Sequence, residues 1–299
     1  MTARNAITAA ALAALVAAPA AQSQSTFRSG TTVVSVNVSV KAGNVPVAGL
    51  AAADFTLKDN GVPQTIDAVA VEAVPIDVTL VVDTSGSAAG AIARLLADAQ
   101  KISGRLRASD RFRLLTIDTY VHQLLPMQAA ERQVWPTRIP YNGASAVHDA
   151  LVAGLLMPVD VDRRHLVVAM TDGVDTTSTL DADAVRRVAG RSDAVMHIVA
   201  LVGVSAPEPI PPNWLPRRDV DLDILQEAAR RTGGELYPAG DLGANVVAAF
   251  DRVFEDFRSS YVLRYTPARV AARGWHELEV KTTRPGKLTL RARRGYFGG

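Results

Sequence analysis

The pattern of hydrophobic and polar residues is that of β-structure at the start of the chain. Residues 32–40, TVVSVNVSV, alternate valine with polar residues, which is typical of a strand with one buried face and one solvated face. Two more extended segments, 55–57 and 64–66, flank Asn60-Gly61, a dipeptide that favours the positive φ of a hairpin turn. The pattern therefore predicts antiparallel β-structure for residues 30–75.

From residue 76 onward, apolar runs typical of buried strands alternate with segments in which apolar residues recur at helical spacing. The run at 76–82 is almost entirely apolar, as expected of a parallel strand that is covered on both faces. Further strands are expected at 112–118, 165–172, 194–203 and 235–237, and helices at 92–106, 146–155, 182–189, 224–229 and 242–257. This order predicts an α/β fold, with a doubly wound, mostly parallel sheet and helices on both faces, over residues 76–258.

The alternation stops at residue 259, and the remainder, 259–299, has the pattern of three strands: YVLRYTP, HELEVKTT and KLTLRARRGYF. Each β-rich end of the chain is too small to bury a core alone, so we expect it to pair with the other end. The result would be a small β-sandwich that flanks the α/β domain inserted into it. The basic run 291–294 is expected to be a solvated edge strand, and the proline-rich segment 205–216 a stiff surface loop.

The first residues, 1–21, have the layout of a cleavable secretory signal. A single early basic residue, Arg4, precedes an apolar stretch at 6–18, and small residues surround the expected cleavage after Ala20 or Ala21. A membrane-spanning anchor is the weaker alternative, because the apolar stretch is shorter than the roughly 20 residues that a bilayer core requires. We therefore expect a secreted or periplasmic protein without a stable membrane anchor.

Composition narrows the chemistry that the chain can perform. The 32 basic and 30 acidic residues nearly cancel, so charge gives no reason to expect nucleic acid as a partner. The chain contains no cysteine, which excludes disulfides, thiolate catalysis and sulfur-ligated metals. A metal ion would have to be held by oxygen or histidine.

Oxygen-bearing side chains follow the ends of two expected parallel strands and precede a helix. Asp83, Ser85 and Ser87 come directly after the first strand, Asp172 ends a later one, and Ser145 precedes the helix at 146–155. Carboxyl ends of parallel strands form the crevice where ligands bind in such sheets. Capping of helix N–H groups explains a single such segment equally well, but it does not explain all of them together. Carboxylates and hydroxyls without thiol or imidazole favour Mg²⁺, Mn²⁺ or Ca²⁺ over zinc or copper.

These residues resemble the von Willebrand factor type A (VWFA) domain with its metal-ion-dependent adhesion site. The signature of that site is DxSxS, a later Thr and a later Asp; Asp83, Ser85 and Ser87 match its first part and Asp172 its last. Ser145, in NGASAVHDAL, stands where the family more often has threonine and keeps the hydroxyl. The flanking segments VAGLAAADFTLKDNGVPQTI and LRARRGYF are similar to those of a bacterial exported subgroup.

The resemblance implies a protein-binding module rather than an enzyme, in which the Asp or Glu carboxylate of a protein partner completes the metal shell. A metal-assisted hydrolase and a metal-free structural or assembly subunit remain alternatives, and nothing in the sequence indicates an oligomeric state. Histidine near the expected site is limited to His148, which we interpret as a satisfied, partly exposed side chain rather than a base. Asp118 and Asp175 are expected to shape the rim of the site.

Overall fold

The computed structural model describes residues 33–298 except 72–73, 87–91, 93–95, 97–100, 103, 133, 141–142, 161, 202–221 and 239–244. The expected signal segment, Ser87 and the proline-rich loop at 205–216 lie outside the described residues. Within the helix expected at 92–106, the described positions 92, 96, 101 and 102 are helical, and residues 104–106 form a turn and bend.

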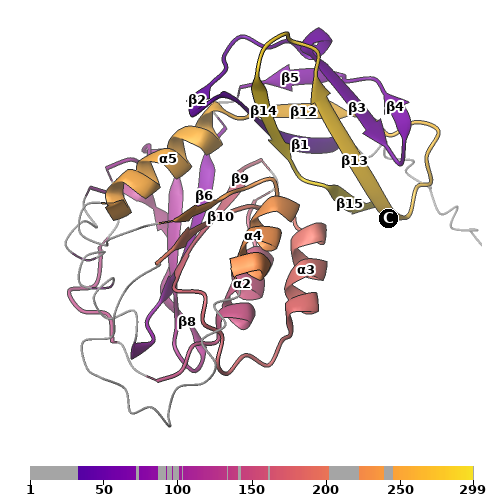
Figure 1. Ribbon diagram of the computed structural model, residues 1–299. Helices are drawn as coiled ribbons and strands as arrows, with labels where there is room; N and C mark the ends of the chain where they lie inside the picture. The colour runs from indigo at the N-terminus through magenta and orange to yellow at the C-terminus, as the bar shows by residue number, and fades with distance from the viewer. Residues whose placement is uncertain are drawn as a thin grey trace, which may run out of the picture. The chain divides into compact units, whose positions relative to one another are not determined.

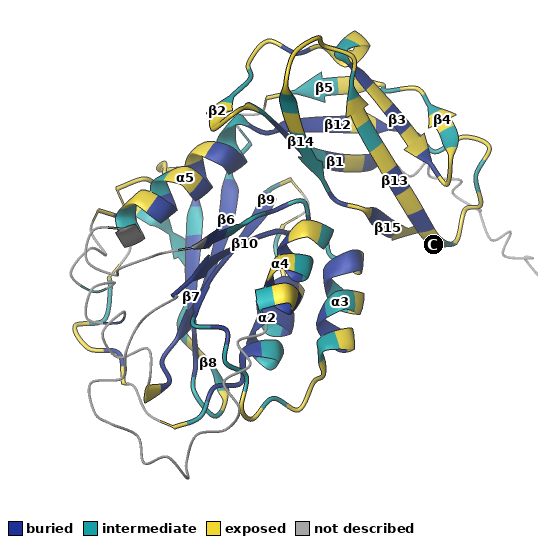
Figure 2. Ribbon diagram, viewed as in Figure 1, coloured by how far each residue is buried: buried dark blue, intermediate teal, exposed yellow. Residues whose placement is uncertain are grey.

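A six-stranded sheet forms the centre of the α/β part of the chain, here residues 76–259 (Figure 1). Its order is β11-β10-β9-β6-β7-β8, and every neighbouring pair is parallel except β7 and β8. The strands are β6 (Ile76–Asp83), β7 (Arg111–Ile117), β8 (Val121–Ala129), β9 (Arg164–Thr171), β10 (Val195–Ala200) and β11 (Leu236–Pro238). All residues of β6, β9 and β10 are buried, which explains their unbroken apolar runs (Figure 2).

Helices cover both faces of this sheet in the described residues (Figure 1). Val82 and its neighbours on one face pack with α5, whereas Val81 and its neighbours on the other face pack with α2, α3 and α4. The bounds are α2 (Val147–Leu156), α3 (Ala182–Arg191), α4 (Leu222–Arg231) and α5 (Asn245–Ser259). Alternate side chains of one strand thus enter two different cores, as the period of a strand requires. The α/β class predicted from the sequence is confirmed.

Strand β8 was not predicted from the sequence. It runs antiparallel to β7 at the edge of the sheet and carries Pro126, which has no N–H to donate to a ladder. Its residues are exposed or half-buried, so their polarity follows no strict alternation. A short 3₁₀ helix (Ala130–Arg132) follows it.

The β-rich part of the chain consists of two sheets that share one hydrophobic core. The first has the order β14-β1-β12-β5 with β2 paired to β1, and the second has the order β15-β13-β3-β4. The strands are β1 (Val34–Ala42), β2 (Val45–Pro46), β3 (Phe55–Asp59), β4 (Val62–Gln64), β5 (Ala68–Ala70), β12 (Tyr261–Tyr265), β13 (Gly274–Thr282), β14 (Leu288–Ala292) and β15 (Gly295–Gly298); a short 3₁₀ helix covers Ala52–Asp54. Strand β1 pairs antiparallel with both β12 and β14, so strands distant in sequence complete one sheet.

In this part of the chain, one detailed prediction from the sequence is correct and another is wrong. Asn60 and Gly61 have φ values of 47° and 77° and join β3 to β4, as their sequence predicted. The last expected strand, KLTLRARRGYF, is in fact two strands, β14 and β15, which belong to different sheets. The break falls at Arg293 and Arg294.

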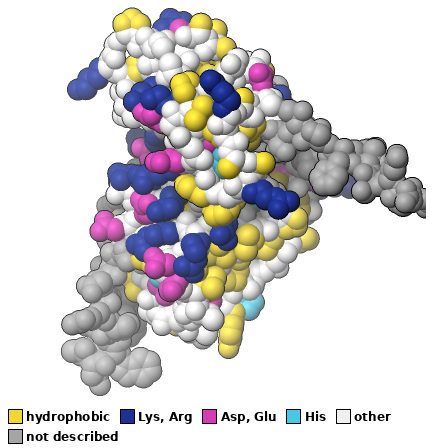
Figure 3. Space-filling view, turned by 90° about the vertical axis from the view of Figure 1, so that its right-hand side faces the viewer, with side chains coloured by type: hydrophobic (Ala, Val, Ile, Leu, Met, Phe, Trp, Pro, Cys, Tyr) yellow, Lys and Arg dark blue, Asp and Glu magenta, His cyan; other side chains and the backbone are white. Residues whose placement is uncertain are grey.

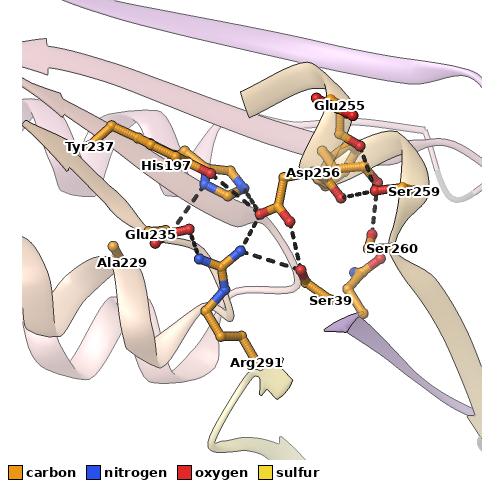
Figure 4. A network of polar contacts seen from close by, with 12 residues as sticks. Ser39, His197, Ala229, Glu235, Tyr237, Glu255, Asp256, Ser259, Ser260 and Arg291 are labelled. Carbon is orange, nitrogen blue, oxygen red and sulfur yellow. Dashed lines mark hydrogen bonds and ion pairs between the residues drawn. The ribbon is translucent and has the colours of Figure 1, made fainter. Parts of the chain in front are cut away.

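Two arginines of the basic run 291–294, Arg291 and Arg293, are largely withdrawn from solvent, so the prediction of a solvated edge strand is wrong for them, whereas Arg294 is exposed. Arg291 forms ion pairs with Asp256 of α5 and with Glu235 (Figure 4). Arg293 forms an ion pair with Asp193. Strand β14 does lie at a sheet edge. Acidic partners distant in sequence explain the burial, and local sequence gives no sign of them.

The surface shows no segregation of charge on the face drawn in Figure 3, where basic and acidic side chains are interspersed. This agrees with the near balance of charges in the sequence. Among the described residues, no helix is both long enough and apolar enough to cross a bilayer.

Candidate functional site

The residues predicted to bind metal gather at the carboxyl edge of the central sheet, where the structure describes them. Asp83 is the last residue of β6, and Thr171, directly before Asp172, is the last residue of the neighbouring strand β9. Ser145 lies just before α2. The parallel pairing of β6 and β9 delivers both strand ends to one place, as the sequence pattern implies.

Asp83 is the centre of this site, and its buried carboxylate accepts hydrogen bonds from three segments of the chain. Its Oδ2 accepts from Ser145 Oγ at 3.1 Å and from Thr171 Oγ1 at 2.8 Å. Its Oδ1 accepts from the backbone N of Ser85 at 2.9 Å. These contacts show directly that Ser145, Ser85 and the end of β9 meet at one carboxylate, which we name the Asp83 cluster.

The electrostatics of Asp83 are unfavourable for a charged carboxylate. Burial raises its pKa above the ordinary value, and the nearby charge of Asp172 raises that pKa further, while hydrogen bonds from Ser85 and Thr171 lower it. In the part of the chain that the structure describes, no lysine, arginine or histidine forms an ion pair with Asp83. The donors around it are neutral hydroxyl and amide groups.

Ser145 is positioned by two loops. Its backbone N donates to Thr176 Oγ1 at 2.8 Å, and its carbonyl accepts from the backbone N of Thr176 at 2.8 Å. The next residue, Ala146, donates its N–H to the carbonyl of Asp118. Gly143 adopts a φ of 78°, and a Cβ at that position would lie 2.7 Å from Thr119 Oγ1, so a glycine is needed for this approach.

The remaining predicted ligands are Asp172, Ser85 and Ser87. Asp172 is half-buried and accepts from the backbone N of Val174 at 3.0 Å through Oδ1, which fixes the loop that follows β9. Ser85 is buried beside Asp83. Ser87, the remaining serine of DxSxS, lies outside the described residues.

The residues expected at the rim hold loops in place. Asp175 Oδ1 accepts from the backbone N of His148 at 3.2 Å and from Ser178 Oγ, so it ties its loop to the start of α2. Asp118 Oδ1 accepts from the backbone N of Tyr120 at 2.8 Å. The His148 ring nitrogen Nδ1 lies 3.2 Å from the carbonyl of Leu180, which agrees with its interpretation as a satisfied histidine.

Sequence reasoning missed the roles of Thr171 and Thr176. Thr171 is fully buried, donates to Asp83 and accepts from the backbone N of Gly173 at 3.0 Å, so it links two parts of the site. A threonine that ends an apolar strand is a common residue, but its position directly before Asp172 was available as a signal. Thr176 accepts a hydrogen bond from the backbone N of Ser145, although it lies 31 positions away in a separate loop. Nothing in the sequence indicated this contact.

The donor chemistry of the cluster fits a hard divalent cation. Carboxylate and hydroxyl oxygens are the ligands that Mg²⁺, Mn²⁺ and Ca²⁺ prefer, and a buried carboxylate beside a second one is relieved by a positive ion. The described residues contain no group of three or more His, Cys, Asp or Glu side chains that could hold a metal. A site here would therefore rely on hydroxyls for a large share of its ligands.

Comparison with known proteins finds matches among solved structures only. No family model matches the sequence, and no curated protein matches it. The von Willebrand factor type A protein from Catenulispora acidiphila matches 90% of this chain and 74% of its own, at 12% identity and a TM-score of 0.46. The ArnB paralogue VWA2 from Sulfolobus acidocaldarius matches 86% of this chain and 73% of its own, at 10% identity and a TM-score of 0.46.

This chain is similar to VWFA proteins. An aerotolerance-related membrane protein from Bacteroides fragilis also matches, over 60% of this chain and 98% of its own, at 17% identity and a TM-score of 0.40. All three TM-scores are below 0.5, so the similarities carry no argument about a metal or a partner.

Proposed function

We propose that this chain is an exported interaction module, with a doubly wound VWFA-like domain that binds a protein partner through a divalent metal ion. One observation carries the proposal: the buried carboxylate of Asp83 meets Ser145 and Thr171 hydroxyls, within the influence of Asp172, and has no basic partner among the described residues. The strand order of the central sheet and its cover of helices on both faces support the doubly wound description.

The residues that would hold the ion are Asp83, Ser85, Ser87, Ser145 and Asp172. We propose Mg²⁺ as the ion, and Mn²⁺ or Ca²⁺ are alternatives. All three ions prefer oxygen ligands. The ion would supply a positive centre able to bind an Asp or Glu carboxylate of the partner. We propose binding rather than catalysis because the described groups that donate to Asp83 are hydroxyls and a backbone amide, with no histidine or lysine among them that could act as a general base.

The first experiment measures metal binding by the melting temperature. Ten millimolar Mg²⁺ should raise the melting temperature of the wild type by about 5 °C or more, if it exceeds the dissociation constant about 100-fold. Asp83→Ala should lose most of this shift. Asp162→Ala is the matched control, since Asp162 is exposed and outside the site, and it should keep the shift.

Equal shifts in the wild type and in Asp83→Ala would contradict the metal site. Partner capture is tested separately, by a pull-down from the envelope fraction in Mg²⁺ and in chelator with the wild type and with Asp83→Ala. The proposal expects the same captured protein to be lost both in chelator and in the variant. Capture that survives both changes would favour the metal-free assembly subunit.

A further inference from the structure

A second candidate site lies at the opposite end of β7 from the Asp83 cluster. A cavity of about 380 Å³ is lined by residues that include Arg111, Arg113, Met127, Met157, Val159 and Asp160. Arg111 is the first residue of β7, whereas Asp83 is paired with Ile117, the last residue of that strand. The cavity is therefore separate from the proposed metal site, and it has the size of a small-molecule pocket.

Arg113 is the unusual residue of this cavity because it is buried and, among the described residues, forms no ion pair, although the charge of Asp77 acts on it at longer range. Its exposure is 4%, and among the described residues its one hydrogen bond runs from Nη2 to the carbonyl of Pro158. Its Nε is buried and has no hydrogen-bond partner there. Buried guanidinium groups are normally paired with carboxylates, because an unpaired buried charge is costly.

The carboxylates near Arg113 are already engaged by other arginines. Asp77 pairs with Arg111 and with Arg163, and Asp160 pairs with Arg111. These groups together comprise three arginines and two aspartates, so one positive charge is in excess. Burial, and to a smaller extent the charge of Arg113, lowers the pKa of His165 to about 4. This histidine is therefore neutral near pH 7 and adds no further charge.

Apart from the arginines, the lining is apolar except for Gln123 and for Asp160, which pairs with Arg111. Met127 comes from β8 and Met157 and Val159 from the segment that follows α2. Methionine adapts its shape to irregular ligands, and arginine binds carboxylate through a planar fork of donors. We propose that this cavity binds a small organic carboxylate, whose acid group pairs with Arg113 and whose short apolar chain lies against Met127 and Met157.

The test uses hexanoate as the probe, titrated into the full chain and followed by calorimetry and by amide chemical shifts. We expect saturable binding with a dissociation constant of about 1 mM, since small ligands of this kind gain only a few kcal/mol. Arg113→Gln should weaken binding about 10- to 100-fold, the equivalent of one charge-assisted hydrogen bond. The control Arg138→Gln, at an exposed arginine outside the cavity, should bind as the wild type does.

A second variant keeps the test valid if Arg113→Gln does not fold. Met127→Glu leaves the bond from Arg113 to Pro158 in place and adds a negative charge to the lining, so it should weaken hexanoate binding about 10-fold. Acetate and hexanol, which each lack one half of the proposed ligand, should both bind more weakly than hexanoate. The proposal is overturned if hexanoate does not saturate, if Arg113→Gln binds it like the wild type, or if acetate binds equally well.

Discussion

Two carboxylates, Asp83 and Asp256, are both almost completely buried, yet their surroundings differ in charge. Asp256 forms an ion pair with Arg291 and accepts from Ser39 Oγ at 2.6 Å (Figure 4). It also forms an ion pair with Lys41, whose Nζ lies 2.9 Å from Oδ1. Asp83 accepts only from neutral hydroxyl and amide groups among the described residues. The chain balances the charge of Asp256 with its own cations, whereas no cation of the described residues pairs with Asp83; our proposal assigns that role to a metal ion. Burial alone therefore does not show whether the charge of a carboxylate is balanced within the chain, whereas its partners do.

The largest expected effect comes from breaking the balanced cluster. Asp256→Ala should lower the free energy of unfolding by about 3 kcal/mol, because it removes the buried carboxylate that Arg291 and Lys41 share and leaves them only the partly exposed Glu235. Urea denaturation measures the change. Asp251→Ala, on the same helix, removes an exposed ion pair with Arg105 and should cost less than about 1 kcal/mol. Similar losses in both variants would mean that the buried network adds nothing beyond a surface pair.

An intermediate effect is expected from His197, which lies in the same network with its Nε2 3.8 Å from Asp256. Burial lowers the pKa of His197 to about 3 from 6.5, so the folded protein keeps this histidine neutral. Below pH 6.5 the unfolded chain binds a proton at His197 and the folded chain does not. The free energy of unfolding therefore decreases as the pH is lowered. Between pH 6.5 and pH 5 this amounts to about 2 kcal/mol.

The measurement for His197 is the unfolding free energy at those two pH values in the wild type and in His197→Gln. The variant should show a pH-dependent loss smaller by about 2 kcal/mol, since glutamine does not titrate. The buried His165, whose pKa is also lowered, remains in both proteins and cancels in the comparison. Identical pH dependence in the two proteins would show that His197 titrates normally.

The smallest change in stability is expected at Asp83. In chelator, Asp83→Asn should alter the free energy of unfolding by about 1 kcal/mol, because the amide oxygen still accepts from Ser145 and Thr171, and the loss of repulsion with Asp172 offsets the lost acceptor for the Ser85 N–H. The same variant should lose the stabilisation by Mg²⁺. Denaturation with and without Mg²⁺, with Asp162→Asn as the control, measures both effects. A loss of several kcal/mol in chelator would make Asp83 a structural residue like Asp256.

Local patterns were sufficient to predict the α/β class and the meeting of distant segments at Asp83. Apolar runs of seven or eight residues identified β6 and β9, and parallel pairing then brought their ends together. Strand β8 was missed because an exposed edge strand needs neither apolar alternation nor a complete set of N–H groups, and it contains Pro126. Periodicity reports burial, so elements with little burial escape it.

Ion-pair partners and loop supports could not be predicted from the sequence. Arg291 and Arg293 lie in a basic run that resembles a solvated strand, and only the fold brings Asp256 and Asp193 to them. Thr176 holds Ser145 from a separate loop in the same way. These contacts depend on tertiary structure, and no local sequence pattern predicts them.

The pairing of β1 with β12 and β14 has a consequence for how the protein is made. Val34 of β1 lies opposite Tyr265 of β12, so this strand leaves the ribosome long before its partners do. Its alternating valines must stay unpaired while the whole α/β part is synthesised, and closure of the sandwich becomes a late step with slow, non-local contacts. A chain that stopped before β12 would release both an unpaired edge and the apolar face of β1, which makes completeness of synthesis a condition for solubility.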